Sequence, residues 1–280
     1  MAIPIRVLLN GCNGRMGRMF TRIAAGHGDI EIVAGTDVIE AKDGDPAAIL
    51  PFPVFINTNG AGGSAGGADN IAGKLKAVDF NVVVDFSHPS ALSFVLVLAT
   101  GRSVPAVLAT TGHSAAQIAE ISEAAKKIPI FRTPNMSIGI NLMTELIKTA
   151  AAVLADGFDI ELIEAHHNQK LDAPSGTALI LADAMNEALS GDREYVYDRH
   201  NIRAKRGKKE IGIHTIRGGT IVGEHSVIFA GTDEVIEIKH TATSREVFAE
   251  GAVRAVRFIT EKGRGPGLYN MRDMISKQFK

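Results

Sequence analysis

The chain has a single cysteine and no long apolar run, and both absences narrow what it can be. With only Cys12 available, no internal disulfide can form, which fits a reducing compartment. No apolar stretch approaches the roughly 20 residues of a membrane-spanning helix. The start, MAIPIRVLLNG, has too short an apolar run for a secretory signal. We therefore expect a soluble cytoplasmic protein.

The chain also lacks an excess of charge of either sign. Its 30 Lys and Arg against 31 Asp and Glu give a formal net charge of -1. No global electrostatic attraction to nucleic acid or to an anionic membrane follows, so we expect neither partner, and any basic site must be local. With 280 residues, of which 45% are hydrophobic, the chain can build a substantial core. We predict two linked domains.

The first part of the chain alternates strand and helix patterns. Pro89 suits the first turn of a helix, and Ser114 suits an N-cap. Repeated alternation of this kind implies a Rossmann-like, doubly wound and mostly parallel sheet of the α/β class. Strands are predicted at 5–10, 31–37, 80–87, 104–110 and 128–132, and helices at 15–27, 89–101 and 114–127.

A glycine-rich turn, GCNGRMG, joins the first strand to the first helix and contains Gly11, Gly14 and Gly17. Glycine permits a tight turn and lets a pyrophosphate approach the backbone N–H groups that open the helix. Asp37 follows at the end of the second strand, where a carboxylate can accept from ribose hydroxyls. The alternative is a glycine-rich turn without a ligand, but this position favours a dinucleotide site.

The residues after Asp37 bear on which dinucleotide binds. A 2′-phosphate is usually met by arginine, whereas here Val38 and Ile39 lead to Glu40, whose carboxylate would repel added negative charge. NADH is therefore favoured over NADPH. Lys42, and Arg15 inside the glycine turn, leave the use of both cofactors open.

After residue 158 the pattern changes to an α+β one. Several predicted strands have little helix between them, which favours a mixed, largely antiparallel open sheet that binds substrate and associates subunits. A long helix at 245–262 has apolar positions at helical spacing and is expected to return to the first domain, with the tail as a cap beside it. The remaining strands are predicted at 158–165, 211–217, 225–230 and 235–241, with a helix at 173–190. We therefore predict a dinucleotide-binding domain of residues 1–136 plus 246–280, and a substrate-binding and oligomerisation domain of residues 137–245.

The segment 164–178, EAHHNQKLDAPSGTA, is the most informative stretch of the chain. Lys170 and a protonated histidine attract carboxylates, and a helix N-terminus offers unpaired N–H groups and the positive end of a dipole. Adjacent strand residues point to opposite faces, so one of His166 and His167 packs or orients while the other faces the cleft. The segment predicts a site that binds a small anion and transfers a proton.

Three further features have simpler interpretations. A zinc site from His166, His167, His225 and Asp172 lacks the usual CxxC or HExxH spacing, so we predict no metal. Cys12 is predicted to be a small packing residue. The glycine-rich segment 57–73 is predicted to be a flexible surface loop, with a lid over the cofactor as the alternative.

The chain resembles the 4-hydroxy-tetrahydrodipicolinate reductase family, also called the dihydrodipicolinate reductases. The resemblance runs nearly end to end, and EAHHxxKxDAPSGTA is its most specific part. It implies NAD(P)H-dependent reduction of 4-hydroxy-tetrahydrodipicolinate, a cyclic dicarboxylate, to tetrahydrodipicolinate in the diaminopimelate route to lysine, by a homotetramer. The motifs that carry it are GCNGRMG, VVVDFSHPS, ATTGH, PNMSIGIN, IEAHHNQKLDAPSGTAL, RGGTIVGEHSVIFAG, IEIKHTATSREVFAEGA and GLYNMRDM.

The resemblance also implies roles for individual residues. His166 matches the family's proton donor, and Lys170 matches the second catalytic position. Arg245 holds either a substrate carboxylate or an inter-strand contact, and Ala109 departs from the family's Gly-Thr-Thr turn. Substrate binding falls to His167, Ser175, Gly176, Thr177 and Arg245. Cofactor binding falls to Gly11, Asn13, Gly14, Arg15, Met16, Gly17, Asp37, Ala109, Thr110, Thr111, Thr133, Pro134, Asn135 and Met136.

Two other hypotheses stay open. In the first, the chain is a different NAD(P)-dependent dehydrogenase of a small acid. In the second, it is a dinucleotide sensor that kept the fold and lost the chemistry. The intact segment 164–178 argues against the sensor.

Overall fold

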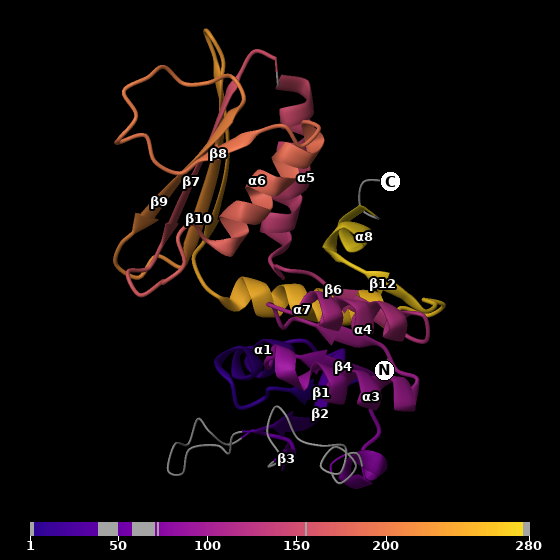
Figure 1. Ribbon diagram of the computed structural model, residues 1–280. Coiled ribbons are helices and arrows are strands. Elements are labelled where there is room, and N and C mark those ends of the chain that lie inside the picture. Colours follow the sequence, from indigo (N-terminus) through magenta and orange to yellow (C-terminus); the bar gives the residue numbers. More distant parts are fainter. Residues whose placement is uncertain (1–2, 39–49, 58–70, 72, 155, 277–280) are drawn as a thin grey trace. The chain divides into compact units, whose positions relative to one another are not determined.

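The computed structural model describes residues 3–38, 50–57, 71, 73–154 and 156–276 (Figure 1). The chain divides into two compact units, one of Met1–Met136 with Glu246–Lys280 and the other of Ser137–Arg245. Glu40 and Lys42 lie outside the described residues, as does most of the segment 57–73.

A seven-stranded sheet forms the first unit, and every strand pairing in it is parallel. Its order is β12-β6-β5-β4-β1-β2-β3, so the strand sequence reverses direction at the β1–β4 pair. The Rossmann-like class is therefore confirmed. The strands are β1 (Ile5–Asn10), β2 (Ile30–Asp37), β3 (Val54–Ile56), β4 (Val82–Asp85), β5 (Ala106–Leu108), β6 (Pro129–Arg132) and β12 (Gly267–Tyr269).

Helices cover both faces of this sheet. α1 (Arg15–Ala25) packs with α7 (Glu246–Ile259), and α7 also contacts β5 and β6. α3 (Leu92–Arg102) packs with α4 (Ala115–Ala125), and these two contact β4, β5 and β6. The late helix α7 thus packs within the first unit, against its sheet. Ser114 caps α4, as expected, in a capping box with Gln117. The unit also contains the 3₁₀ turns η3 (Leu75–Ala77) and η4 (Pro89–Ala91) and the short helix α8 (Met271–Ser276).

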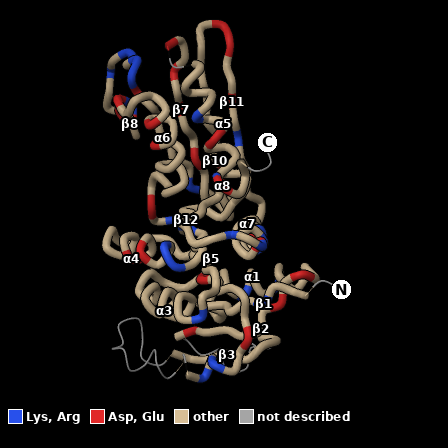
Figure 2. Tube along the Cα trace, turned by 90° about the vertical axis from the view of Figure 1, so that its right-hand side faces the viewer, with Lys and Arg blue, Asp and Glu red and all other residues tan. Residues whose placement is uncertain are grey.

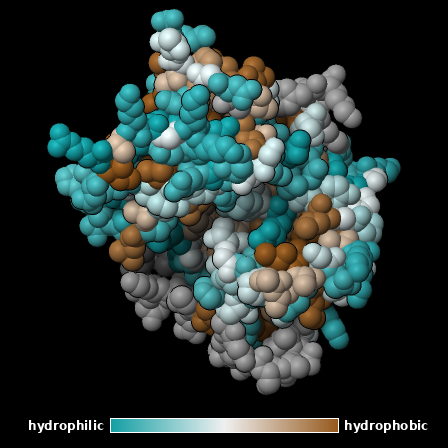
Figure 3. All heavy atoms as spheres, turned by 45° about the horizontal axis from the view of Figure 1, so that its top comes forward, coloured by the Kyte–Doolittle hydropathy of each residue, from teal (hydrophilic) through white to brown (hydrophobic). Residues whose placement is uncertain are grey.

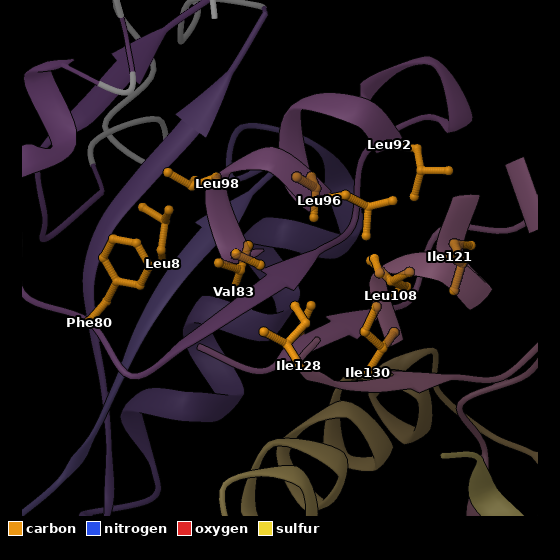
Figure 4. Close-up of a cluster of buried hydrophobic side chains, with 14 of the residues drawn as sticks. Leu8, Phe80, Val83, Leu92, Leu96, Leu98, Leu108, Ile121, Ile128 and Ile130 are labelled. Atoms are coloured by element: carbon orange, nitrogen blue, oxygen red, sulfur yellow. The ribbon is translucent and has the colours of Figure 1, made fainter. Parts of the chain in front are cut away.

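The main apolar core of the first unit lies between the sheet and the α3–α4 pair (Figure 4). Leu8 and Val83 from the strands meet Leu92, Leu96 and Ile121 from the helices, and all five are buried. Since the sheet is covered on both faces, its strands read as continuous apolar runs rather than alternating ones.

A five-stranded sheet of order β11-β10-β7-β9-β8 forms the second unit. β10 is antiparallel to β7 and β11, whereas β9 is parallel to β7 and β8, so the predicted mixed sheet is confirmed. β9 and β10 follow each other in sequence but lie on opposite sides of β7. The strands are β7 (Asp159–His166), β8 (Glu194–Val196), β9 (Glu210–Arg217), β10 (Gly223–Ala230) and β11 (Val235–Ala242).

Helices α5 (Ile138–Leu154) and α6 (Gly176–Ala188) pack together on one face of this sheet (Figure 1). Their apolar residues, among them Ile147 and Leu181, meet Leu162, Ile213 and Phe229 from the strands. This second core supports the end of β7, which carries the histidine pair.

Several elements were not predicted. α5 is one of them, although its polar residues Asn141, Glu145 and Lys148 recur at helical spacing. β3, β8 and β12 have three residues each, too few for an alternating pattern. The tail was expected to be a cap beside the late helix, and Tyr269 does meet Phe258 of α7 at 5.9 Å between ring centroids. The same tail also adds β12 to the edge of the sheet.

The surface is polar and mixed in charge. Acidic and basic residues are interspersed along both units (Figure 2), and the face drawn in Figure 3 is mostly hydrophilic. Among the described residues, no helix is long and apolar enough to cross a membrane.

Two helical glycines give opposite predictions for stability. A Cβ at Gly251 in α7 would strike the backbone carbonyl oxygen of Met136, whereas a Cβ at Gly101 in α3 would meet open space. We expect Gly251→Ala to lower the free energy of unfolding by about 1–3 kcal/mol, because backbone cannot step aside as a side chain can. Gly101→Ala should raise it by roughly 0.5 kcal/mol through helix propensity. Urea denaturation of both variants checks this, and equal effects would contradict it.

Candidate active site

The residues assigned to the cofactor follow the carboxyl ends of parallel strands. Gly11 comes after β1, Asp37 ends β2, Ala109 comes after β5, and Thr133 comes after β6. Because the strands are parallel, these ends share one edge of the sheet. The strand order reverses between β1 and β4 at this edge, which is where ligands bind in open α/β sheets.

The glycine turn fits a group that needs close approach to backbone. Gly11 has φ +79, and a Cβ there would lie 2.7 Å from the carbonyl oxygen of Phe86. A Cβ at Gly17 would lie 2.8 Å from Cα of Cys12. Gly14 is the N-cap of α1, and no side chain caps that first turn. The amides there are thus available to a phosphate, which the dipole of α1 also favours.

Asp37 fastens this turn to the end of β2. Its Oδ2 accepts from the backbone N–H of Asn13 and its Oδ1 from that of Val38, both at 2.8 Å. Cys12, in the same turn, is fully buried, and burial raises the pKa of its thiol to about 12, so it packs as a neutral group. The sequence did not indicate that Asp37 also holds the shape of the turn.

The loops after β5 and β6 complete this edge. Ala109 donates its N–H to the carbonyl of Asp85 at 2.9 Å, and its φ is not positive, so alanine fits where the family has glycine. The hydroxyl of Thr133 donates to the carbonyl oxygen of Asn135 at 3.0 Å, which closes a tight turn before the buried Met136. The chain therefore fits a dinucleotide at this edge.

In the second unit, β7 carries a buried carboxylate beside the first histidine. Glu164 is fully buried, and His166, two residues later on the same strand, faces the same side. Nδ1 of His166 lies 2.5 Å from Oε2 of Glu164. Arg217 of β9 donates to both carboxylate oxygens at 2.8 Å. Oε1 also accepts from the N–H of Ser175 at 3.0 Å and the hydroxyl of Thr215 at 3.1 Å.

Sequence reasoning did not assign a function to Glu164. The available signal was its position two residues before His166 in a predicted strand, which places both on one face. Arg217 lies 53 residues from Glu164 in sequence, and only the pairing of β7 with β9 brings them together.

These contacts set the protonation states. Burial works against an ionised Glu164, but the bonds from Arg217, His166 and Ser175 outweigh it and hold the pKa of that carboxyl below its usual value. Burial lowers the pKa of His166, and Lys170 and Arg217 add to this, while Glu164 opposes it. Near neutral pH the carboxylate is therefore ionised and His166 is mostly neutral.

His225 supports the pair from β10. It is buried, its ring meets that of His166 edge-on at 5.2 Å between centroids, and its Nε2 lies 3.2 Å from the hydroxyl of Ser175. Burial, helped by the nearby His166, lowers the pKa of His225 to about 3, so it stays neutral. Among the described residues, no group of three or more His, Cys, Asp and Glu could hold a metal ion.

The other residues predicted to bind the substrate lie where β7 ends and α6 begins. The N–H of Lys170 donates to the carbonyl of His167 at 3.1 Å, and its ammonium lies 2.9 Å from Asp172. Arg245 approaches Nε2 of His167 at 3.3 Å. Ser175 is the N-cap of α6, with its hydroxyl accepting from Ala178 at 3.1 Å. Cations, helix amides and an imidazole thus lie around one end of the sheet, as an anionic substrate requires.

Gly176 and Thr177, the other two residues predicted to bind a carboxylate, lie in the first turn of α6. A Cβ at Gly176 would meet nothing within 4 Å. The Lys170 ammonium and, to a lesser extent, the backbone N–H of Gly176 lower the pKa of Asp172, so this helix start already meets one carboxylate.

Comparison with known proteins matches nearly the whole chain to one family. The model of the dihydrodipicolinate reductase N-terminus matches residues 5–136, and that of the C-terminus matches residues 139–275. A 4-hydroxy-tetrahydrodipicolinate reductase of Caldanaerobacter subterraneus is 47% identical over 275 residues, covering 98% of this chain and 99% of its own. One of Clostridium tetani is 47% identical over 274 residues, with 98% of each chain covered.

Solved structures show the same fold. A dipicolinate-bound dihydrodipicolinate reductase from Paenisporosarcina sp. TG-14 matches with a TM-score of 0.77 at 24% identity, covering 98% of this chain and 100% of its own. GenD2 from gentamicin A biosynthesis, in complex with NAD, matches with a TM-score of 0.59 at 12% identity, covering 99% of this chain and 91% of its own.

Gly11 gives a direct test of the cofactor edge. Gly11→Ala forces a Cβ towards the Phe86 carbonyl at a positive φ, so we expect the Kd for NADH, measured by calorimetry, to rise more than about tenfold. Gly28→Ala is the matched control, because a Cβ there meets nothing within 4 Å. Wild-type affinity in Gly11→Ala would refute this use of the turn.

Proposed function

The chain belongs to the dihydrodipicolinate reductase family, and on that premise we propose how its residues divide the reduction of 4-hydroxy-tetrahydrodipicolinate. It is an NAD(P)H-dependent oxidoreductase of diaminopimelate and lysine biosynthesis. The first unit, residues 1–136 and 246–280, binds the cofactor, and residues 137–245 bind the substrate.

The substrate is a small cyclic dicarboxylate, and we propose that the cationic groups at the end of β7 bind it. Lys170 anchors one carboxylate and polarises the ring nitrogen, while His167 and Arg245 contact the acid. The amides of Gly176 and Thr177, at the start of α6, donate to the other carboxylate. Lys170 and Arg245 carry full charges, and the helix start adds a partial one, so two negative charges are matched within a short span.

The cofactor is assigned to the carboxyl edge of the first sheet. A bound nicotinamide cofactor supplies the hydride. The turn Gly11–Gly17 would cradle its pyrophosphate, Asp37 its adenosine ribose, and residues 109–111 and 133–136 its nicotinamide end. The carboxylate of Asp37, already oriented by Asn13 and Val38, supports a preference for NADH over NADPH.

His166 completes the reaction by donating a proton after hydride transfer. Its unperturbed pKa of about 6.5 suits a group that must exchange protons near neutral pH. Lys170, close enough to lower the pKa of His166, stabilises the charge that develops on the ring. The observation that carries the proposal is the Glu164–His166 pair at the end of β7, adjoining the start of α6.

A cytoplasmic location and a homotetramer are also proposed, on the family resemblance and not on the geometry of one chain. The rival functions are a dehydrogenase of another small acid and a non-catalytic sensor of dinucleotide. A proton donor, a cation and a helix start assembled at one strand end argue against the sensor, and the family match argues against another dehydrogenase.

Substitution of the two catalytic candidates tests this function. With the product of the preceding synthase supplied, we expect His166→Gln and Lys170→Met each to lower kcat by roughly 10²-fold or more, because proton donation and charge stabilisation are lost. The Kd for NADH should not change. Matched controls are His214→Gln and Lys148→Met, which remove a histidine and a lysine paired elsewhere in this unit.

Three outcomes discriminate between the hypotheses. Wild-type rates in both variants would overturn the assigned roles. Binding of NADH with no substrate-dependent oxidation would favour the sensor. Pyridine-2,6-dicarboxylate, a planar mimic of the ring, should compete with the substrate, and its failure to compete would favour another dehydrogenase.

Cofactor preference depends on the charge at Asp37. Asp37→Asn keeps the acceptor for Asn13 but removes the charge that repels a 2′-phosphate. We expect the ratio of kcat/KM for NADH to that for NADPH to fall by roughly tenfold. Glu31→Gln, an exposed carboxylate near the opposite end of β2, is the control. An unchanged ratio in Asp37→Asn would remove Asp37 as the discriminating group.

A further inference from the structure

Strand β7 carries two carboxylate–histidine–arginine clusters, one on each face. Glu164 contacts His166 and Arg217, and Glu161, three residues earlier, contacts His214 at 2.7 Å and Arg206 at 2.8 Å. The chemical groups are the same, but the surroundings differ. The side chain of Glu164 is 0% exposed, whereas those of Glu161 and His214 are 23% and 40% exposed. The buried cluster alone adjoins the predicted proton donor.

The contacts of Glu164 determine where His166 carries its proton. An ionised carboxylate only accepts hydrogen bonds, so Nδ1 of His166 must be the protonated nitrogen at 2.5 Å from it. Arg217 keeps the carboxylate ionised by donating to both of its oxygens, and is itself held by the carbonyl of Asp172 at 2.6 Å. Nε2 is then the nitrogen that can take up and deliver a proton.

The residue beside Nε2 of His166 has no side chain. Gly223, the first residue of β10, lies next to His166, and a Cβ there would come within 3.1 Å of Nε2. Glycine therefore keeps this side of the ring uncrowded.

We propose that Glu164, held by Arg217, is a positioning residue that fixes His166 with its Nδ1 proton inward and its Nε2 as the proton-donating atom. This inference rests on the proposed function, in which His166 is the donor. The same carboxylate oxygen that accepts from Arg217 also accepts from the N–H of Ser175, the N-cap of α6. Glu164 therefore sets the orientation of the proton donor and of the carboxylate-binding helix start together.

Glu164→Gln makes the inference testable, because the contacts predict which way the new amide turns. Oε1 meets three donors, from Ser175, Thr215 and Arg217, whereas Oε2 meets only Arg217 and His166. The amide oxygen should take the Oε1 position, and its NH₂ should face Nδ1. Of the two groups that contact the Oε2 position, Arg217 can only donate, so His166 must become the acceptor by moving its proton to Nε2.

The side-chain ¹⁵N NMR spectrum of His166 reports this tautomer directly, with His166→Gln used to assign the signal. We expect protonated Nδ1 in the neutral wild type, protonated Nε2 in Glu164→Gln, and the wild-type pattern in the control Glu161→Gln. A wild-type spectrum with the proton on Nε2 would overturn the inference without any variant, as would an unchanged tautomer in Glu164→Gln.

Kinetics supply a second readout. The charged or titratable groups around His166 are Glu164 on its own strand, Lys170 in the following loop, Arg217 on β9 and His225 on β10. Of these only Glu164 favours the imidazolium, so its loss lowers the pKa of His166. We expect Glu164→Gln to lower kcat by roughly 10²-fold and to shift the fall of kcat with rising pH to lower pH. Glu164→Asp, which keeps the charge, should recover part of the rate, and Glu161→Gln should change neither.

The two measurements separate failure of this inference from failure of the proposed function. If the wild-type chain did not reduce the dicarboxylate, the proposed function would fail, yet the NMR result would still decide whether Glu164 fixes the tautomer. If turnover is normal and Glu164→Gln keeps the wild-type rate and pH profile, the positioning role is wrong.

Discussion

The buried carboxylate of Glu164 is the constraint on which the substrate end of the protein depends. An ion taken out of water costs several kcal/mol unless its lone pairs are satisfied. Here five hydrogen bonds from four residues satisfy them, including both arms of Arg217. Because those residues belong to β7, β9 and the start of α6, the carboxylate is satisfied only when the strands are in register and the helix begins at Ser175. Any other geometry would leave the buried carboxylate without some of its hydrogen bonds, and the free-energy cost of that loss favours the observed arrangement of the site.

The cofactor edge is built on the opposite principle, the absence of side chains. Gly11 and Gly17 lie where a Cβ would collide with neighbouring backbone, so the turn can fold back on itself against the start of α1. A single carboxylate, Asp37, pins that turn through Asn13. The first unit therefore forms the cofactor edge by close approach of backbone segments, whereas the second unit forms the substrate end by surrounding a buried carboxylate with hydrogen-bond donors. Local sequence reveals the first kind of site far more readily.

That contrast explains how much could be predicted. The glycine turn, Asp37 and the parallel sheet follow from local patterns, since strand, turn and helix are contiguous. The segment from Glu164 to Thr177 revealed its histidines and its helix start for the same reason. Arg217 could not be found in this way, because only the parallel pairing of β7 with β9 brings it to Glu164. α5 was missed although its polar residues Asn141, Glu145 and Lys148 recur at helical spacing, so in this case the sequence did contain the signal.

The charges around His166 also couple substrate binding to proton delivery. Burial lowers the pKa of His166 and the nearby Lys170 and Arg217 lower it further, so the imidazole is mostly neutral although its proposed task is to donate a proton. The substrate brings two carboxylates to the same end of β7, and Lys170 is among the cations proposed to bind them. Negative charge placed there offsets the effect of Lys170, while Glu164 continues to favour the imidazolium, so the pKa of His166 rises. In the proposed binding mode, the charge of the substrate thus favours protonation of its own donor.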